Sequence, residues 1–263
     1  MGWWGTLVGG ALGFAIGGPL GAILGAALGR NVDQSLGGNR RERLGAGEQE
    51  RVQAAFFTAT FSIMGHLAKV DGHVTRDEIA LAEQVMSRMQ LGADQRKAAI
   101  NLFNEGKREG FPLEEVLEQF RVECHRRVSL VQMFLEIMIS TALADGRLDL
   151  QEERLLYHIG DRLGFPRPWF ERLVAMVQGQ QHFTDGASKA PPADLLKDAY
   201  NVLGIDRNVT DAEVKTAYRR LMNQHHPDKL VAKGLPEEMM KLATEKTQEI
   251  KKAYELIKGK RGM

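Results

Sequence analysis

Apolar residues recur at three- and four-residue steps over most of the chain, from about residue 50 to 178 and again from about 194 onward. Such spacing places the apolar side chains on one face of a helix. Between residues 50 and 178 no stretch alternates convincingly with a period of two, and β-branched residues are sparse. The pattern therefore predicts an all-α protein.

The N-terminal segment differs from the rest, because no charged side chain precedes Arg30. About twenty apolar residues suffice to cross a bilayer as a helix, so residues 1–30 are predicted to form a transmembrane anchor in the lipid bilayer. A cleaved signal peptide would need a basic stretch before the apolar run, and none is present. Pro19 interrupts the pattern, and the sequence leaves open whether it kinks or breaks the helix.

Glycine recurs at every fourth residue of this anchor. Glycines on one face let two membrane helices approach closely, which predicts a homodimer through the anchor rather than a monomeric span. The predicted dimerisation residues are Gly5, Gly9, Gly13, Gly17, Gly21, Gly25 and Gly29.

Basic residues follow the anchor and none precedes it. Because positive charge stays on the cytoplasmic side, the arginines of the next segment place the rest of the chain in the cytoplasm; they are Arg30, Arg40, Arg41 and Arg43. Glycine and proline content marks two linkers, residues 31–49 and 179–193. They separate a predicted middle domain at 50–178 from a C-terminal domain at 194–263.

The middle domain has apolar stripes typical of core helices, in Phe56, Phe57, Phe61, Met64 and Leu67, and in Leu130, Phe134, Leu135, Met138 and Leu143. It also holds an internal repeat, in which an Asp-Gly pair is followed by a potential helix cap, Thr75 with Glu78 and Asp149 with Glu152. The repeat copies only the second half of an EF-hand loop, because the leading acids are absent. A looser metal site is left open, at Asp71, Asp145, Glu78 or Glu152.

Composition argues against several classes of function. Cys124 is the single cysteine, which excludes a disulfide framework and a cysteine-rich zinc site within one chain. Adjacent residues on a helix face different ways, so Cys124 and His125 make a poor nucleophile and base. The net charge of +1 gives no sign of nucleic-acid binding. We therefore expect no catalytic residues, cofactor or bound metal.

The C-terminal domain contains two helix-like segments around His226-Pro227-Asp228. Thr210 followed by Glu213 is a capping box that would begin the first helix, and Pro227 would end it. Pro236 and two acids would open the second helix. Two helices joined by a loop of roughly ten residues should pack antiparallel, with His226-Pro227-Asp228 at the tip of the hairpin.

These segments resemble the J domain of DnaJ-type co-chaperones, in AYNVLGI at 199–205, AYRRLMNQHHPDK at 217–229 and QEIKKAYELI at 248–257. The resemblance implies docking on a DnaK-type ATPase chaperone and stimulation of its ATP hydrolysis. The implied contact residues are His226, Pro227, Asp228, Lys215, Arg219, Arg220 and Lys229.

The repeat in the middle domain resembles TerB-like domains of tellurite-resistance proteins. The order of anchor, TerB-like domain and J domain is similar to that of membrane-anchored DnaJ-like co-chaperones of Gram-negative bacteria. That resemblance implies a co-chaperone at the cytoplasmic face of the inner membrane, whose client protein the sequence does not name. The alternative is an envelope-stress sensor or adaptor whose middle domain binds one partner or a metal and recruits the chaperone.

Overall fold

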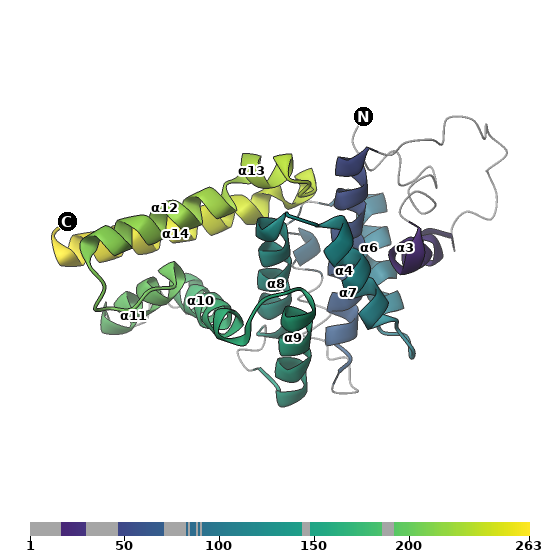
Figure 1. The fold of residues 1–263 in the computed structure, drawn as a ribbon, viewed down its shortest axis with the longest axis horizontal. Helices are drawn as coiled ribbons and strands as arrows, with labels where there is room; N and C mark the ends of the chain where they lie inside the picture. Colours follow the sequence, from purple (N-terminus) through teal and green to yellow (C-terminus); the bar gives the residue numbers. More distant parts are fainter. Residues whose placement is uncertain are drawn as a thin grey trace.

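A computed structural model describes residues 17–29, 47–70, 91–143, 148–185 and 192–263, together with 83, 85–87 and 89. The regular structure in these ranges is helical throughout, which confirms the predicted fold class. A bundle of helices is joined to a long C-terminal hairpin that leans against one side of it (Figure 1).

The bundle is built around α4 (Glu48–Leu67), which carries the first predicted stripe. Nearly every side chain from Val52 to Leu67 is buried, as expected for a helix with neighbours all round. Those neighbours include α6 (Ala93–Gly106), α7 (Leu113–Glu123) and α8 (Val128–Ala142). The second predicted stripe lies on α8, where Phe134 packs 4.7 Å, centroid to centroid, from Phe120.

Two glycines allow α4 and α6 to touch through their backbones. A methyl group added at Gly106 would lie 1.7 Å from the carbonyl oxygen of Ser62, and one at Gly65 would lie 1.9 Å from that of Phe103. Real side chains never come this close, so the observed helix spacing requires glycine at both positions.

Two further helices complete the bundle, α9 (Leu150–Arg162) and α10 (Arg167–Asp185). The predicted cap of Asp149 and Glu152 is confirmed, because Asp149 accepts a hydrogen bond from the amide of Gln151 and Glu152 accepts one from the amide of Asp149. The corresponding pair, Thr75 and Glu78, lies outside the described residues, as do both Asp-Gly pairs.

The described part of the anchor segment is α3 (Gly18–Gly29), a 12-residue helix. Gly17 and Gly18 have φ angles of +56° and +58°, so the α-helix begins there instead of continuing back through Gly17. Pro19 stands in the first turn, where its missing N–H is not needed. Within the described residues, no helix is both long and apolar enough to cross a bilayer.

Helix α3 lies on the bundle, against α6 and α7, with Leu20, Leu24 and Ala27 buried. Two side chains of the bundle bind its ends. Gln119 accepts a hydrogen bond from the amide of Leu20 and donates one to the carbonyl of Gly17, while Asn101 donates one to the carbonyl of Ala27.

The C-terminal part contains α11 (Pro192–Leu203), which packs along α10, and then the hairpin of α12 (Asp211–His225) and α14 (Met240–Arg261). Two expectations are corrected here. The connection is not an open loop, because it forms α13 (Pro227–Ala232). The second long helix starts at Met240, after a 3-10 turn η1 (Glu237–Met239), since the backbone at Pro236 is extended.

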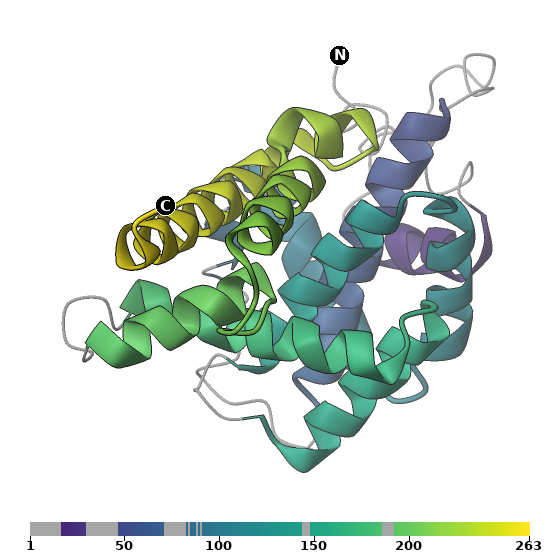
Figure 2. The ribbon, with the colours of Figure 1, turned by 60° about the vertical axis from the view of Figure 1, so that its left-hand side comes forward.

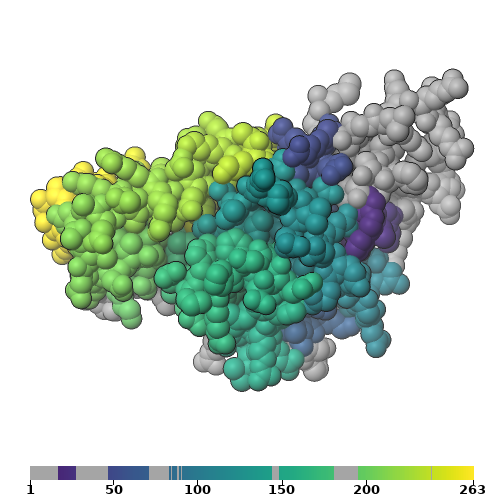
Figure 3. Space-filling model, viewed as in Figure 1, coloured from purple at the N-terminus to yellow at the C-terminus, as the bar shows by residue number. Residues whose placement is uncertain are grey.

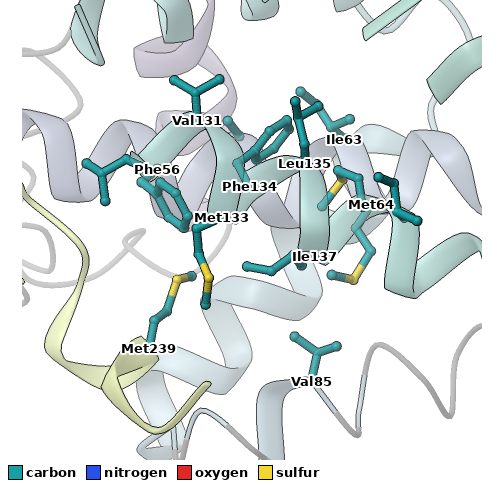
Figure 4. Packing of buried hydrophobic residues seen from close by; sticks show 14 of the residues in the cluster. Phe56, Ile63, Met64, Val85, Val131, Met133, Phe134, Leu135, Ile137 and Met239 are labelled. Carbon is teal, nitrogen blue, oxygen red and sulfur yellow. The ribbon is translucent and has the colours of Figure 1, made fainter. Parts of the chain in front are cut away.

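The hairpin and the bundle share one hydrophobic cluster. Met239, fully buried at the end of η1, points toward Met133 of α8 (Figure 4). A second view shows α12 and α14 running side by side above α10 and α11 (Figure 2), and in the space-filling view the C-terminal helices lie directly against the bundle (Figure 3).

Candidate functional site

The tip of the hairpin is set by local sequence at both of its ends. Glu213 accepts hydrogen bonds from the amide and the hydroxyl of Thr210 at 2.7 and 2.8 Å, which confirms the predicted cap of α12. At the other end His226 has φ −59° and ψ 123°, the extended conformation that a following proline imposes. Pro227 then occupies the first position of α13, so one residue both ends α12 and begins the next helix.

The three residues of the tip differ in exposure from the histidine that precedes them. His226 and Asp228 are exposed and Pro227 is half-buried, whereas His225 retains only 1% of its exposed area. The two histidines therefore have separate roles. His225 belongs to the interior of the protein, and His226 is available to another molecule.

A basic surface extends from the tip along α12. Four basic side chains there are exposed, those of Lys215, Arg219, Arg220 and Lys229. Lys229 donates a hydrogen bond to the side chain of Asn223. Among the described residues, no carboxylate forms an ion pair with any of the four cations, so their positive charge is available to an acidic partner.

A cleft of about 330 Å³ lies beside this surface, between α12 and the last helix of the bundle. Arg220 and Leu221 line it from α12, and Trp169, Leu173 and Met176 line it from α10. Arg220 therefore faces both the cleft and the basic surface. Sequence patterns could not indicate this cleft, because its two walls are far apart in the chain.

The segment after the tip is attached to the bundle at three points. Lys233 donates a 3.0 Å hydrogen bond to the hydroxyl of Ser129, and Gln49 donates one to the carbonyl of Val231. Gly234 has a φ of +102°, and a methyl group there would lie 2.7 Å from Val52. The segment after the tip is therefore held against the starts of α4 and α8.

A buried ionic cluster joins the hairpin to the bundle directly behind the tip. The carboxylate of Glu136 on α8 lies 2.7 Å from the ammonium of Lys246 on α14 and 3.5 Å from Nε2 of His225. Gln132 donates a 3.0 Å hydrogen bond to Glu136, and Lys246 donates one to Gln180 of α10. All five side chains are buried.

Burial and neighbouring charges shift the pKa values of two groups in this cluster, His225 and Glu136. Burial lowers the pKa of His225, and the charge of Lys246 lowers it further. The charge of Glu136 raises it, but the net effect is a lowered pKa. Burial alone would raise the pKa of Glu136, but electrostatic attraction by His225 and Lys246, with hydrogen bonds from Lys246 and Gln132, outweighs that effect, and the pKa lies below its usual value. Glu136 and Lys246 form the ion pair of this cluster, and burial favours the neutral form of His225.

Sequence reasoning missed this cluster, although two signals were present. Gln132 and Glu136 are polar residues four apart in the stretch of α8 from Leu130 to Ile139, whose other residues are all apolar. Lys246 lies three residues after Ala243 and four before Ile250, which is the spacing of the buried stripe of α14. A charge at a core position indicates a buried partner, but spacing along the chain does not identify that partner.

The remaining candidate residues can also be placed. Burial raises the pKa of the Cys124 thiol to about 12, which keeps it protonated at neutral pH. In the described ranges no three His, Cys, Asp or Glu side chains lie close enough to hold a metal; Asp71, Asp145 and Glu78 lie outside them. Of the glycine repeat, Gly17, Gly21, Gly25 and Gly29 are described, and Gly5, Gly9 and Gly13 are not.

Comparison with known families gives three matches along the chain. Residues 57–175 match the family described as tellurite resistance protein TerB, and residues 198–261 match the DnaJ domain. Residues 1–47 match the family described as the co-chaperone DjlA transmembrane domain.

Curated relatives are similar over most of their length. The co-chaperone protein DjlA of Photobacterium profundum is 47% identical over 219 residues, which cover 80% of this chain and 79% of the relative. The proteins of the same name from Salmonella typhimurium and Escherichia coli are 48% and 47% identical, and 80% of this chain aligns with 81% of each. No solved structure matches the chain.

Proposed function

Since the chain belongs to the DjlA family of J-domain co-chaperones, we propose that it stimulates the ATPase of a DnaK-type chaperone at the cytoplasmic face of the inner membrane. The observation that carries this proposal is the exposed His226-Pro227-Asp228 tip at the end of a basic helix surface. The tip would contact the chaperone, and the basic surface would orient it.

Electrostatics supports this division of labour. Lys215, Arg219, Arg220 and Lys229 lie on one helix and its immediate continuation, without described anionic partners. Unpaired surface charges speed encounter with an oppositely charged surface and set the register of the complex. We therefore expect an acidic docking surface on the ATPase. The protein itself acts as a regulator, and ATP hydrolysis takes place in its partner.

The direct test is single-turnover ATP hydrolysis by the cognate DnaK-type chaperone, with the full-length protein reconstituted in lipid nanodiscs. The wild type should accelerate hydrolysis, and His226→Gln should not. His125→Gln is the matched control, because His125 is also exposed but lies in the middle domain. Equal acceleration by the wild type and His226→Gln would refute the proposal.

Membrane attachment would add an effect of local concentration. We propose that residues 1–30 anchor the protein as a single span and that residues 31–49 and 179–193 connect the middle domain to its neighbours, although the first of these segments ends within α4 and the second includes the end of α10 and the start of α11. The flanking arginines favour a cytoplasmic location for everything beyond the anchor. Tethering raises the concentration of the J domain near membrane-bound clients without any new contact.

Protease accessibility tests this orientation. In inverted inner-membrane vesicles, added protease should digest the C-terminal domains. Protection of these domains from the protease would show the opposite orientation.

We propose further that the anchor pairs two copies through its glycine face, so that two J domains are presented together. Gly9→Leu combined with Gly13→Leu should weaken self-association in a membrane two-hybrid assay. Ala11→Leu combined with Ala15→Leu is the matched control, with bulk added at the same spacing on another face. If both double variants pair like the wild type, the glycine face is not the interface.

A further inference from the structure

The buried carboxylate of Glu136 makes the bundle and the hairpin depend on each other. An isolated charge in a protein interior is costly unless an opposite charge lies beside it. Glu136 belongs to the bundle, yet the two cationic or titratable groups beside it, Lys246 and His225, both belong to the hairpin. Separation of the two parts would expose the apolar surface around Met239 and break this ion pair.

The cluster also lies at a functionally sensitive place. His225 is the residue immediately before His226, and Glu136 contacts it while contacting α14 through Lys246. One side chain of the bundle, Glu136, therefore contacts both long helices of the hairpin. Together with the attachments of Lys233 and Gly234, it holds the segment after the tip at both ends.

We infer that Glu136 is a positioning residue for the His226-Pro227-Asp228 tip, through which the middle domain sets the affinity of the J domain for its ATPase partner. The inference rests on the proposed function and deepens it. A tip that is already ordered loses less conformational freedom on docking, and affinity rises accordingly. Glu136 itself does not contact the partner.

The decisive experiment is a double-mutant cycle in the full-length protein in nanodiscs, read out by ATPase stimulation at increasing co-chaperone concentration. Glu136→Met leaves Lys246 as a buried cation without its counter-charge, and should raise the half-stimulating concentration about tenfold. Stimulation at saturation should stay at the wild-type level, because His226 and the basic surface are unchanged.

The second arm of the cycle separates positioning from general damage. Glu136→Met combined with Lys246→Met replaces the ion pair by apolar side chains of similar length, and should return the half-stimulating concentration to within about twofold of the wild type. Glu114→Met is the matched control. Glu114 also pairs with a histidine and a second cation, His158 and Arg162, but it is exposed and contacts only the bundle. It should behave like the wild type.

Amide hydrogen exchange of residues 228–235 provides a readout that does not depend on the ATPase. Exchange there should be faster in Glu136→Met than in the wild type, and restored in the double variant. Glu136→Gln, which preserves the shape, should give a smaller change of the same sign and replaces Glu136→Met if that variant fails to fold.

Three results would overturn the inference: unchanged exchange and stimulation in Glu136→Met, no rescue in the double variant, or loss of maximal stimulation at an unchanged half-stimulating concentration. A wild type that does not stimulate the ATPase at all would instead refute the proposed function. The hydrogen-exchange arm would still test the role of Glu136 in holding the tip.

Discussion

The guanidinium of Arg261, near the C-terminal end of the chain, donates a 2.6 Å hydrogen bond to the hydroxyl of Tyr200 on α11. The same side chain donates 2.6 Å bonds to the carbonyls of Arg207 and Val209, in the connection to α12. The end of α14 is thereby tied to the first helix of the J domain and to the turn that follows it.

Arg261→Met should destabilise the J domain by about 2 kcal/mol, because it removes four charge-assisted hydrogen bonds, to Tyr200, Arg207, Val209 and Asp211, and leaves two carbonyls without this donor. The loss of folding stability is limited because the Arg261 side chain is partly exposed to water. Chemical denaturation followed by circular dichroism measures the change. Lys260→Met, at an exposed neighbouring position, should leave the unfolding midpoint unaltered.

Gly106→Ala should be among the most destabilising single-methyl substitutions in the protein, with a loss of about 3 kcal/mol, because the methyl group meets the backbone of Ser62 and no rotamer avoids it. Gly259→Ala is the matched control. It adds the same methyl group to a helix where nothing lies within 4 Å, and should stabilise the protein by up to about 1 kcal/mol. A similar thermal shift for both variants would contradict the close contact of α4 and α6.

His225 makes folding stability depend on pH near neutrality. Its pKa is lowered in the folded state, so the unfolded chain binds more protons just below the ordinary value of about 6.5. The stability contributed by the neutral ring is present above that value and is lost as the pH falls through it. Urea unfolding at pH 7.5 and at pH 5.5 should show a lower free energy of unfolding at the acidic pH.

His225→Gln should reduce this difference without abolishing it. Burial also lowers the pKa of His66 on α4. That histidine therefore causes a further loss of folding stability as the pH falls over the same range. The double variant with His66→Gln should therefore depend least on pH. Glu136 causes a separate loss of folding stability at lower pH. Its pKa is lowered in the folded state, so the stability that its charged form contributes disappears as the pH falls below about 4.5.

Reversal of charge on α12 should slow association with the ATPase. Lys215→Glu combined with Arg219→Glu should lower the association rate constant by about tenfold at low salt and weaken its dependence on ionic strength. Lys251→Glu combined with Lys252→Glu changes the net charge equally at exposed positions of α14. Stopped-flow binding should show a much smaller effect for this second pair, and equal effects would mean that net charge, rather than the α12 surface, steers the encounter.

Local signals in the sequence predicted the ends of α12 and the buried stripes of α4 and α8 correctly. Thr210 with Glu213 and the pair His226-Pro227 act within a few residues, so their effect is fixed by neighbours in the chain. Helix α13 escaped prediction because Pro227, read as a stop signal, also suits the first turn of a helix. Proline can either end a helix or begin one, and Pro227 does both here, which depends on the folded structure around it.

The ionic cluster escaped prediction for a different reason. Glu136 and Lys246 are far apart in the chain, and their pairing depends on how two parts of the protein dock. A charged residue inside an apolar stripe shows that a partner must exist, whereas the identity of the partner is a property of tertiary structure. The contact of Gly106 with Ser62 is equally invisible, because glycine gives no periodic signal of its own.

Helix α3 has a consequence for the physical state of the protein. Its apolar face can be covered by the bundle or by lipid, but not by both at once, and Gln119 and Asn101 must release its ends before residues 18–29 enter a bilayer. Departure of α3 also uncovers the surface of α6 and α7 on which it rests. Water-exposed and membrane-inserted forms of this protein therefore differ in more than location. Insertion of residues 18–29 would thus be a change between two thermodynamic states of one chain, with the lipid as the ligand that selects between them.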